Sequence, residues 1–328
     1  MEKFLVDIPV ILIFFTRDDT LKKVFEKIKE AKPSKLFLVQ DGARRERPDD
    51  EERIQRCRQI VEDIDWECEV FKNYAEENMG CGKRVSSGIS WAFQHVDRLV
   101  ILEDDCVVEP TFFEFSRQLL EKYKDDSRVG MISALNHFKE WNCGKNDYFF
   151  VKTGPIAAWA TWKRVWDQFD FSISDYSDVY FKKLLQQSFH HDRAARHMLK
   201  HWNRIYQRIQ NGEKIRFWGA QYSYLMYKLN AVAIVPQHSL SCNIGVGDGA
   251  TFSGPGLRFM RKAVREWFFH ETRPMEFPLK HPQAVLPDED YDNRYYKISY
   301  PNKIAEFFTR GFYYIKRKLY KRKYRRKH

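Results

Sequence analysis

The sequence predicts an α/β fold in which a mostly parallel, Rossmann-like sheet is flanked by helices. Three observations support this prediction. Short apolar runs alternate with segments of helical spacing, the 328 residues can bury a large core, and 43% of them are hydrophobic. Strands that are separated by single helices form parallel sheets, and ligands bind beyond the carboxyl ends of such strands.

The first half of the chain carries the clearest alternation of strands and helices. The expected strands are the apolar runs at 9–16, 35–40, 66–71 and 98–102, and the expected helices between them lie at 21–31, 49–63 and 84–95. The second half is less regular. It predicts helices at 112–123, 154–169 and 178–210 and strands at 129–135 and 231–236.

Cysteines and the N-terminal segment indicate the compartment. The six cysteines show no C-x-x-C pair or regular spacing, which argues against a zinc site and a disulfide framework. The apolar run Ile8–Phe15 is too short to span a membrane, and charged residues follow it directly. We therefore expect a first strand here, and a cytoplasmic protein with reduced thiols.

Three consecutive acids, Glu103, Asp104 and Asp105, directly follow the apolar strand at 98–102. In an extended chain Glu103 and Asp105 would share one side and Asp104 would take the other. Such close carboxylates repel one another unless protonation or a cation relieves them. Mg²⁺ or Mn²⁺ would do so, because these ions prefer carboxylate and phosphate oxygens. A solvated acidic loop is the simpler alternative.

Polar residues also follow the first two predicted strands. Thr16 and Arg17 come after the first and Asp41 after the second, so they should meet the acids at one edge of the sheet. The loop N-M-G-C-G-K-R at 78–84 precedes a predicted helix. Its glycines let backbone N–H groups approach an anion, and Lys83 or Arg84 can supply charge to a phosphate.

The segment LVILEDDCVVEPTFFEF resembles the Glu-Asp-Asp motif of the N-acetylglucosaminyltransferase I type within the GT-A superfamily of nucleotide-sugar glycosyltransferases. IPVILIFFTRDD and LFLVQDG are also similar to this family. NMGCGKRVSSGISWAF and PQHSLSCNIGVGDGAT resemble bacterial glycosyltransferases of the same branch, which are often found with cell-surface polysaccharide genes. The resemblance covers roughly residues 7–255. It implies a GT-A fold, a UDP-sugar donor and an inverting transfer that uses Mn²⁺ or Mg²⁺.

The resemblance also implies roles for individual residues. Asp105 contacts the metal, Asp104 lies near the ribose, and Arg17 and Asp41 contact the donor base, with Asp41 pairing to a uracil-like edge. The full set expected to bind the donor, by residues and resemblance together, is Thr16, Arg17, Asp41, Lys83, Glu103 and Asp104. On the acceptor side we expect a pocket with Trp218, Gln221, His238 and Asn243.

The chain departs from the family where the relatives carry a Trp-Asp-x-Gln segment, whose acid is expected to be the general base. Trp218 and Gln221 are kept, but Gly219 stands where the acid should be. Glu213 and Asp248 are candidate replacements, and Asp175 or Asp178 are others; each can also be a plain surface acid. A general base contributes roughly 10²- to 10⁴-fold to the rate. A protein that binds the donor without turnover is therefore the alternative.

The positive charge of the chain is concentrated at its C-terminal end. The net charge is +11, and ten Lys and Arg with no acid lie between Arg310 and His328, so the rest is nearly neutral. From Ile304 onward, apolar residues at helical spacing alternate with these cations. We expect a basic amphipathic helix that lies on an anionic membrane surface, where each cation contributes about 1 kcal/mol. A solvated tail and a nucleic-acid-binding tail are the alternatives.

These predictions combine into one hypothesis. Residues 1–270 form a glycosyltransferase domain with a nucleotide-sugar-binding half (1–135) and an acceptor half (136–270), followed by a Pro-rich linker (271–302) and the basic tail (303–328). The expected function is sugar transfer to a glycan or lipid-linked acceptor at the inner face of the membrane, with no nucleic-acid partner. A membrane-tethered scaffold and a nucleotidyltransferase are the rivals.

Overall fold

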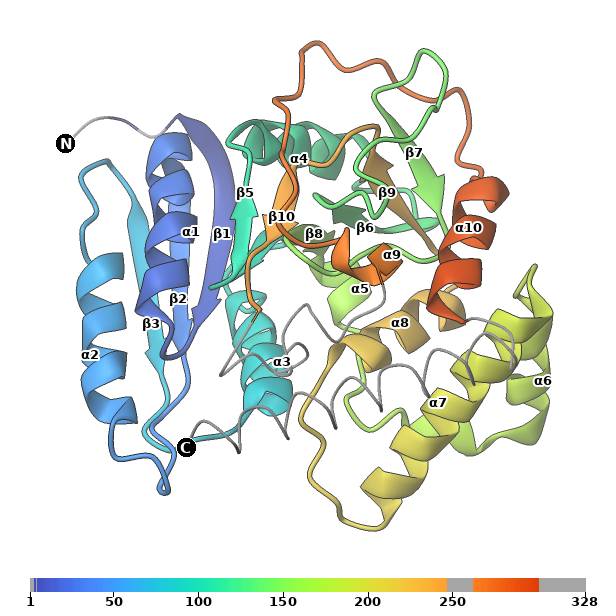
Figure 1. The fold of residues 1–328 in the computed structure, drawn as a ribbon, viewed down its shortest axis with the longest axis horizontal. Coiled ribbons are helices and arrows are strands. Elements are labelled where there is room, and N and C mark those ends of the chain that lie inside the picture. Colours follow the sequence, from blue (N-terminus) through green and yellow to red (C-terminus); the bar gives the residue numbers. More distant parts are fainter. Residues whose placement is uncertain (1–2, 4, 247–261, 301–328) are drawn as a thin grey trace, which may run out of the picture.

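A computed structural model describes residue 3 and residues 5–246 and 262–300 of the chain. In this part a central eight-stranded sheet has the strand order β3-β2-β1-β4-β8-β6-β9-β7 (Figure 1). Only β7 and β8 run against the other strands. The predicted α/β class with a mostly parallel sheet is therefore confirmed. The expected basic helix at 303–328 lies outside the described residues.

The first half of the chain forms the parallel part of the sheet. Its elements are β1 (Val6–Phe14), α1 (Asp18–Ala31), β2 (Pro33–Gln40), α2 (Asp50–Val61), β3 (Glu69–Tyr74), α3 (Cys81–Ala92) and β4 (Arg98–Glu103). β1 pairs in parallel with both β2 and β4, and β2 with β3. This register brings the carboxyl ends of β1, β2 and β4 to one edge of the sheet.

The second half completes the sheet and adds a helical layer. Its elements are β5 (Cys106–Val108), α4 (Thr111–Lys122), β6 (Val129–Ser133), β7 (Tyr148–Val151), β8 (Trp159–Trp162), α5 (Lys163–Trp166), the 3-10 helix η1 (Ser174–Ser177), α6 (Val179–Gln187), α7 (Asp192–Gln210), α8 (Gly219–Lys228), β9 (Val232–Pro236), β10 (Ser241–Asn243), α9 (Lys262–Arg265) and α10 (Glu289–Ser299). β10 pairs with β5 in a separate antiparallel ribbon.

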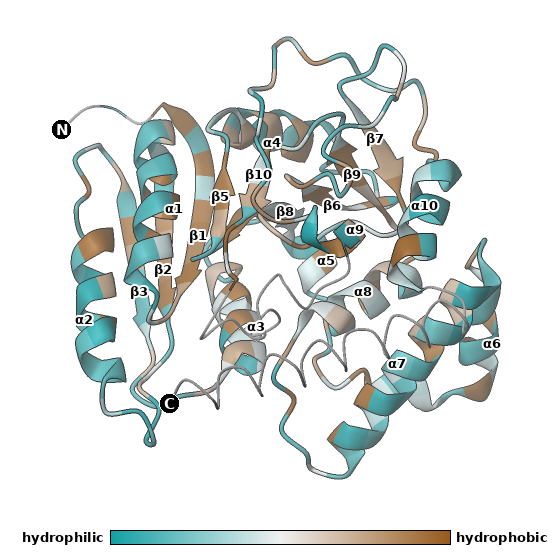
Figure 2. Cartoon of the chain, in the orientation of Figure 1, coloured by the Kyte–Doolittle hydropathy of each residue, from teal (hydrophilic) through white to brown (hydrophobic). Residues whose placement is uncertain are grey.

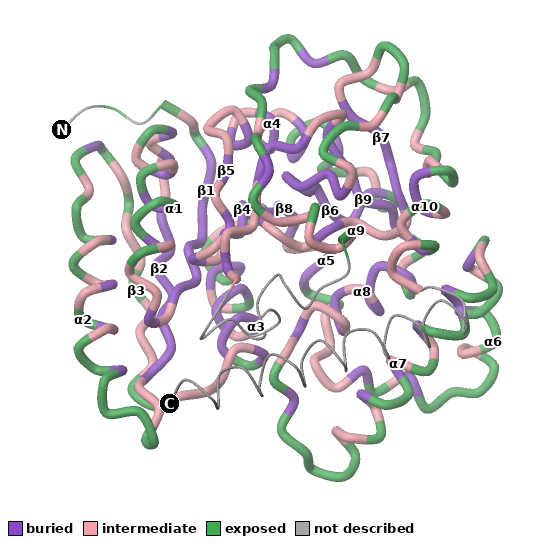
Figure 3. Tube along the Cα trace, viewed as in Figure 1, coloured by how far each residue is buried: buried purple, intermediate pink, exposed green. Residues whose placement is uncertain are grey.

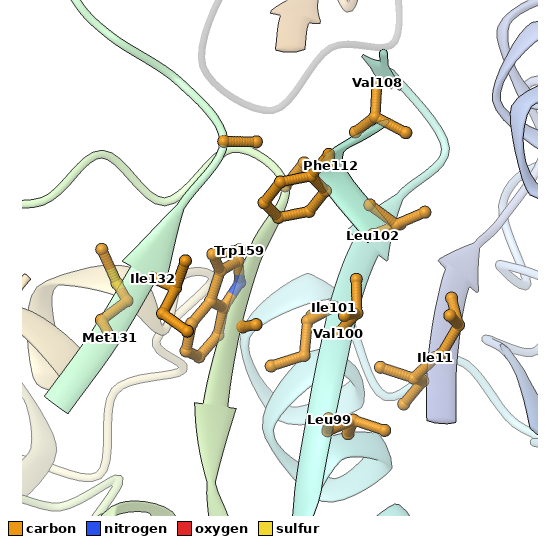
Figure 4. Packing of buried hydrophobic residues seen from close by; sticks show 14 of the residues in the cluster. Ile11, Leu99, Val100, Ile101, Leu102, Val108, Phe112, Met131, Ile132 and Trp159 are labelled. Atoms are coloured by element: carbon orange, nitrogen blue, oxygen red, sulfur yellow. The ribbon is translucent and has the colours of Figure 1, made fainter. Parts of the chain in front are cut away.

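The main core lies on both faces of the sheet. Most strand residues outside the edge strand β3 are apolar and buried, whereas α1, α2, α6 and α7 turn polar faces outward (Figures 2 and 3). Figure 4 shows Ile11, Ile101 and Trp159 from neighbouring strands packed together with Phe112 of α4. Each of these side chains is at most 1% exposed. Burial of whole aromatic and aliphatic side chains is the main stabilising contribution to such a fold.

A second, smaller core joins α6 and α7 to α8. These two helices lie far from α2, at the opposite side of the molecule (Figure 1). Trp202 of α7 is fully buried in this core, and its indole N–H donates to the Ala220 carbonyl of α8 at 3.0 Å. The predicted helical stretch at 178–210 is thus two helices, with His191 capping the second through the Ala194 N–H.

Two predicted segments differ from the structure. The helix expected at 154–169 is replaced by strand β8 and the short helix α5, because Trp159, Trp162 and Trp166 pack against both the sheet and the helices. The expected linker at 271–302 contains α10, whose Tyr291 is fully buried and donates its hydroxyl to Asn136 Oδ1.

Asp292 of α10 anchors the same segment to the domain. Its carboxylate accepts the Lys152 N–H at 2.8 Å and the Thr153 N–H at 3.3 Å. Burial raises the pKa of Asp292 to about 7, although these hydrogen bonds act in the opposite direction. The part of 271–302 that contains α10 is therefore packed against the domain.

Candidate functional site

The carboxyl ends of β1 and β4 meet in a cluster of three charged side chains. Arg17, which follows β1, donates from Nη2 to Asp104 Oδ1 at 2.5 Å and to Asp105 Oδ2 at 2.9 Å. The other oxygen of Asp104 accepts the Phe15 N–H at 3.1 Å. Thr16 is buried in the turn between Phe15 and Arg17. The structure thus brings together Arg17 and two of the three acids, as the strand ends predicted.

Burial and crowding of the acids govern the electrostatics of the cluster. Burial raises the pKa of Glu103 to about 8, and the neighbouring Asp105 and Asp104 carboxylates add to this increase. Burial also raises the pKa of Asp104 to about 6, against the attraction of Arg17. Burial lowers the pKa of Arg17, but the two aspartates outweigh it and raise that pKa overall. The Arg17 guanidinium therefore offsets only part of the burial and repulsion that the carboxylates experience.

The directions of the three acids differ from the expected alternation. β4 ends at Glu103 and the chain turns at Asp104 and Asp105, so that both aspartates face Arg17 while Glu103 does not. The expected alternation assumed a continuous strand, whereas the chain turns at Asp104 and Asp105; that Glu103 and Asp105 share one side stays a prediction. A tight turn between β4 and β5 replaces the extended chain.

Asp105 is the predicted metal ligand. In the described residues, no group of three or more His, Cys, Asp or Glu side chains converges in a way that could hold a metal. Asp105 Oδ1 accepts from Asn243 Nδ2 at 3.4 Å and from the Cys106 thiol at 3.3 Å, whereas Oδ2 accepts from Arg17 at 2.9 Å and keeps a lone pair for a metal ion. Such a donor set fits an Mg²⁺ or Mn²⁺ ion whose other ligands are phosphate oxygens and waters.

Residues after β10 close over Asp105. Asn243 pairs with Cys106 across the ribbon and also accepts the Gly245 N–H at 2.8 Å. A Cβ atom on Gly245 would lie 1.8 Å from Asp105 Oδ2, so only glycine allows the present approach of backbone and carboxylate. Asn243 was expected in the acceptor pocket but lies beside the acid that would hold the metal. Gly245 lies in the segment PQHSLSCNIGVGDGAT, where nothing in the sequence marks this glycine apart from its neighbours.

Asp41 organises the loop before α3. Its Oδ1 accepts the N–H groups of Gly42 and Met79, and its Oδ2 accepts the N–H of Gly80 and the side-chain amide of Asn78. Asp41 is 5% exposed and has four donors within 3.1 Å. The structure gives it a positioning role for this loop, and the predicted contact with a base stays a prediction.

Two lysines, Lys83 and Lys214, lie near the start of α3, and Lys214 comes from a segment that was not expected there. Arg84 is buried and donates to the carbonyls of Gln40 and Asn73, which rules it out as a free phosphate ligand, whereas Lys83 is exposed. A Cβ atom on Gly80 would lie 3.6 Å from Lys214 Nζ, so this second lysine borders the same loop. Lys214 had no motif that could have identified it.

The predicted acceptor residues lie in different surroundings. Trp218 is 4% exposed and stacks on Trp159 with 5.6 Å between ring centroids, so it belongs to the core. Gln221 is 1% exposed, and its Oε1 has no hydrogen-bond partner among the described residues. His238 lies apart from both, at a surface cavity, where Nε2 contacts the Pro274 carbonyl oxygen at 3.2 Å.

Three of the four acids proposed to replace the missing general base lie in the described part of the chain, and each forms an ion pair or hydrogen bond with a neighbouring residue. Glu213 is exposed and pairs with Arg208 at 2.8 Å. Asp175 accepts from Tyr224 and pairs with Lys228, and Asp178 caps α6 through the Phe181 N–H. Asp248 lies outside the described residues.

Gly219, which stands where the family carries an acid, is the first residue of α8. A Cβ atom on Gly82 of α3 would lie 2.9 Å from the Phe217 backbone, so the chain leading to Gly219 packs against the first turn of α3. The position where an acid is expected is thus held close to the loop that Asp41 organises.

Comparison with known proteins finds only distant structural matches. No family model and no curated protein matches the sequence. Among solved structures, the inositol-1-phosphate CTP transferase from T. maritima aligns with a TM-score of 0.36 and 12% identity, over 73% of this chain and 89% of the other. The UTP-bound UGPase from Acinetobacter baumannii aligns with a TM-score of 0.32 and 8% identity, over 72% and 88%.

A UDP-glucose pyrophosphorylase complexed with UDP-glucose aligns with a TM-score of 0.30 and 11% identity, over 49% of this chain and 78% of that one. None of these three proteins is named as a glycosyltransferase. Similarities of this size do not identify a family, so the resemblance to the N-acetylglucosaminyltransferase I type stays a prediction.

Proposed function

We propose that this protein binds a nucleotide-sugar, most simply a UDP-sugar, at the carboxyl edge of β1, β2 and β4, and transfers the sugar to an acceptor hydroxyl. The observation that carries the proposal is the cluster of Arg17, Asp104 and Asp105 at the ends of two adjacent parallel strands. Ligands of open α/β sheets bind at this edge.

The diphosphate of the donor is the group that these side chains fit best. The N-terminal end of α3 carries partial positive charge, and Lys83 and Lys214 lie at or beside it. A divalent ion bound at Asp105 would neutralise the charge that develops on the departing diphosphate. Arg17 would keep the Asp104 and Asp105 carboxylates in place, and Asp41, which accepts the Met79 and Gly80 N–H groups, would hold the loop that leads into α3.

A catalytically degenerate nucleotide-sugar-binding protein is the second candidate function. It is favoured by Gly219, which has no side chain to accept a proton, and by the structural engagement of Glu213, Asp175 and Asp178. The position itself can hold an acid. A Cβ atom there meets only Ile156 Cδ1 at 3.6 Å, an ordinary contact, and an aspartate in the first turn of α8 would interact favourably with the helix dipole.

Release of UDP from a panel of UDP-sugars, with glycan and lipid-linked acceptors and Mn²⁺, separates the two candidates. A catalytic protein releases UDP only when an acceptor is present, and a degenerate one binds UDP without turnover. In the second case we expect Gly219→Asp to raise turnover by roughly 10²-fold or more. Gly219→Asn, which has nearly the same shape but no acid, is the matched control. The proposal would be contradicted if the rate of product formation did not depend on the presence of a UDP-sugar.

The membrane surface is proposed as the place of action. No helix in the described parts of the chain is both long and apolar enough to cross a membrane. α7 presents a row of exposed cations on one face, none with an ion-pair partner among the described residues: Arg193, Arg196, Lys200 and Arg204. The row shows that basic charge is not confined to the tail, and it would add to the attraction of anionic lipids.

Cosedimentation with vesicles tests this membrane proposal. The full chain should bind vesicles that contain anionic lipid and should not bind neutral ones. Deletion of 304–328 should remove most of the binding, and charge reversal of Arg196 and Lys200 should weaken the remainder. Binding that survives the deletion unchanged would contradict the role of the tail.

A further inference from the structure

A polar surface cavity of about 350 Å³ lies beside β10, outside the cluster of Arg17 and the aspartates. Pockets that bind small molecules have volumes of about 300–1,000 Å³, so this cavity has room for a small ligand. Its walls come from three segments far apart in the sequence, and the residues that matter are Lys139, Glu140, Phe269, His270, Glu271 and Arg273.

The cavity lies at a short distance from Asp105. The Arg273 N–H donates to the Ser239 carbonyl at 3.4 Å and the Phe269 N–H to the Asn243 carbonyl at 3.3 Å, so 269–273 runs along 239–243. Asn243 in turn contacts Asp105. Because four residues of extended chain span about 13 Å, the lining extends from Phe269, beside Asn243, to Arg273 and Ser239 roughly 13 Å farther along the chain. A group bound there is within one or two sugar rings of the proposed donor phosphates.

His270 is the side chain that points to a ligand. It lines the cavity, is only 7% exposed, and neither ring nitrogen has a hydrogen-bond partner of normal geometry among the described residues, although the Ser241 backbone lies near the ring. Burial lowers the pKa of His270, and the nearby Lys139 adds to this effect, so the ring is neutral. A neutral imidazole has one donor and one acceptor, and buried groups without partners are rare in folded proteins.

The charges of the cavity balance. Lys139 and Arg273 are matched by Glu140 and Glu271, and Arg273 pairs with Glu140 at 3.2 Å. A pyrophosphate or another anion would therefore find no net positive charge at this place. Groups that both donate and accept hydrogen bonds, such as hydroxyls, fit the mixture of His, acid and base side chains better.

An exposed aromatic ring borders the cavity. Phe269 is 55% exposed although it is a large apolar residue, and its backbone has a φ of 51°. Lys139, on the opposite segment, also has a positive φ, of 68°. Non-glycine residues in this region are uncommon and concentrate at functional sites. The exposed ring offers a flat apolar surface to the C–H face of a sugar.

We infer that this cavity holds a neutral sugar ring of the acceptor, with hydroxyls on His270 and the ring face on Phe269. That the bound sugar belongs to the acceptor depends on the proposed function, whereas the presence of a sugar-binding site is inferred from the cavity alone. A lipid-linked acceptor would accordingly place its first neutral sugar here and its pyrophosphate elsewhere.

Ligand-observed NMR on the full chain tests the inference. The probes are methyl β-D-glucopyranoside and methyl β-D-galactopyranoside, with methyl β-D-glucuronide as the anionic comparison, each with and without UDP and Mn²⁺. At least one neutral glycoside should bind with a Kd of roughly 1 mM, and tighter than the glucuronide. Phe269→Ala and His270→Phe should each weaken this binding roughly tenfold, while Tyr180→Ala, which removes an equally exposed ring from α6, should leave it unchanged.

The UDP affinity of each variant separates failure of this inference from failure of the proposed function. Both cavity variants should keep the UDP affinity of the unmodified chain, which also shows that they fold. Intact UDP binding with no glycoside binding, or with glycoside binding that neither variant changes, would overturn the inference alone. Tighter binding of the glucuronide than of both neutral glycosides would also overturn it. Absence of UDP binding in the unmodified chain would instead count against the proposed function.

Discussion

Replacement of Arg17 by methionine should destabilise the protein strongly, because the guanidinium is the only cation bonded to Asp104 and Asp105 in the described residues. Removal of one partner from a buried ion pair costs about 3–5 kcal/mol. The Arg17 side chain is 23% exposed and those of the aspartates 6% and 15%, so solvent screens part of the effect. We therefore expect a loss of about 2–4 kcal/mol in the free energy of unfolding at pH 7.

A double-mutant cycle separates charge imbalance from lost packing. Asp104→Asn keeps an oxygen to accept the Phe15 N–H but removes one of the negative charges. When it is combined with Arg17→Met, the double variant should be more stable than the sum of the single changes predicts, by about 1–2 kcal/mol. Urea unfolding followed by circular dichroism measures all four proteins.

The exposed pair of Arg117 and Glu114 is the matched control. Its partners are 41% and 30% exposed, so Arg117→Met should cost less than about 1 kcal/mol. Our reasoning would be refuted if Arg17→Met cost no more than this control, or if the two changes at Arg17 and Asp104 were simply additive.

Three further predictions concern other parts of the molecule. Burial raises the pKa of Asp292 from 3.8 to about 7, so the stability that this group contributes is complete below pH 4 and is lost as the pH rises through 7. When the pH is raised from 5 to 8, the free energy of unfolding of Asp292→Asn, measured in urea, should therefore gain roughly 2–3 kcal/mol relative to the unmodified chain. Gly245→Ala should displace Asp105 and weaken Mn²⁺-dependent UDP binding in calorimetry roughly tenfold or more; the added Cβ would lie 1.8 Å from Asp105 Oδ2 and 2.7 Å from Asp105 Cβ, so the backbone must shift as well and the melting temperature should also fall. Trp202→Ala should cost about 3–5 kcal/mol in the same unfolding assay, whereas exposed Tyr180→Ala should change stability by less than about 0.5 kcal/mol; equal effects would show that the second core contributes little.

The parallel half of the fold could be predicted from the sequence because its strands are continuous apolar runs. The runs at 9–16, 35–40 and 98–102 match β1, β2 and β4 to within three residues at each end. β8 could not be predicted, since Trp159, Trp162 and Trp166 fit a helical spacing as well as a buried strand. β5 and β10 have three residues each, too few for any period to show.

The candidate site was predictable in position and less so in detail. Polar residues at strand ends correctly placed Arg17 beside Asp104 and Asp105, because parallel strands share an edge. The four bonds of Asp41 could not be foreseen, since three of its donors come from residues 78–80, on a loop whose path depends on tertiary packing. The closeness of Gly245 to Asp105 likewise depends on the pairing of β10 with β5.

Calorimetric titration of UDP in the presence of Mn²⁺ is the most direct test of the central claim, that Asp105 and its neighbours form a nucleotide-diphosphate site. The unmodified chain should bind UDP more tightly with Mn²⁺ than without it. Asp105→Asn, which is nearly isosteric, should abolish that gain, while Arg117→Met should retain it. Manganese-independent UDP binding, or the same manganese effect in Asp105→Asn, would contradict the account.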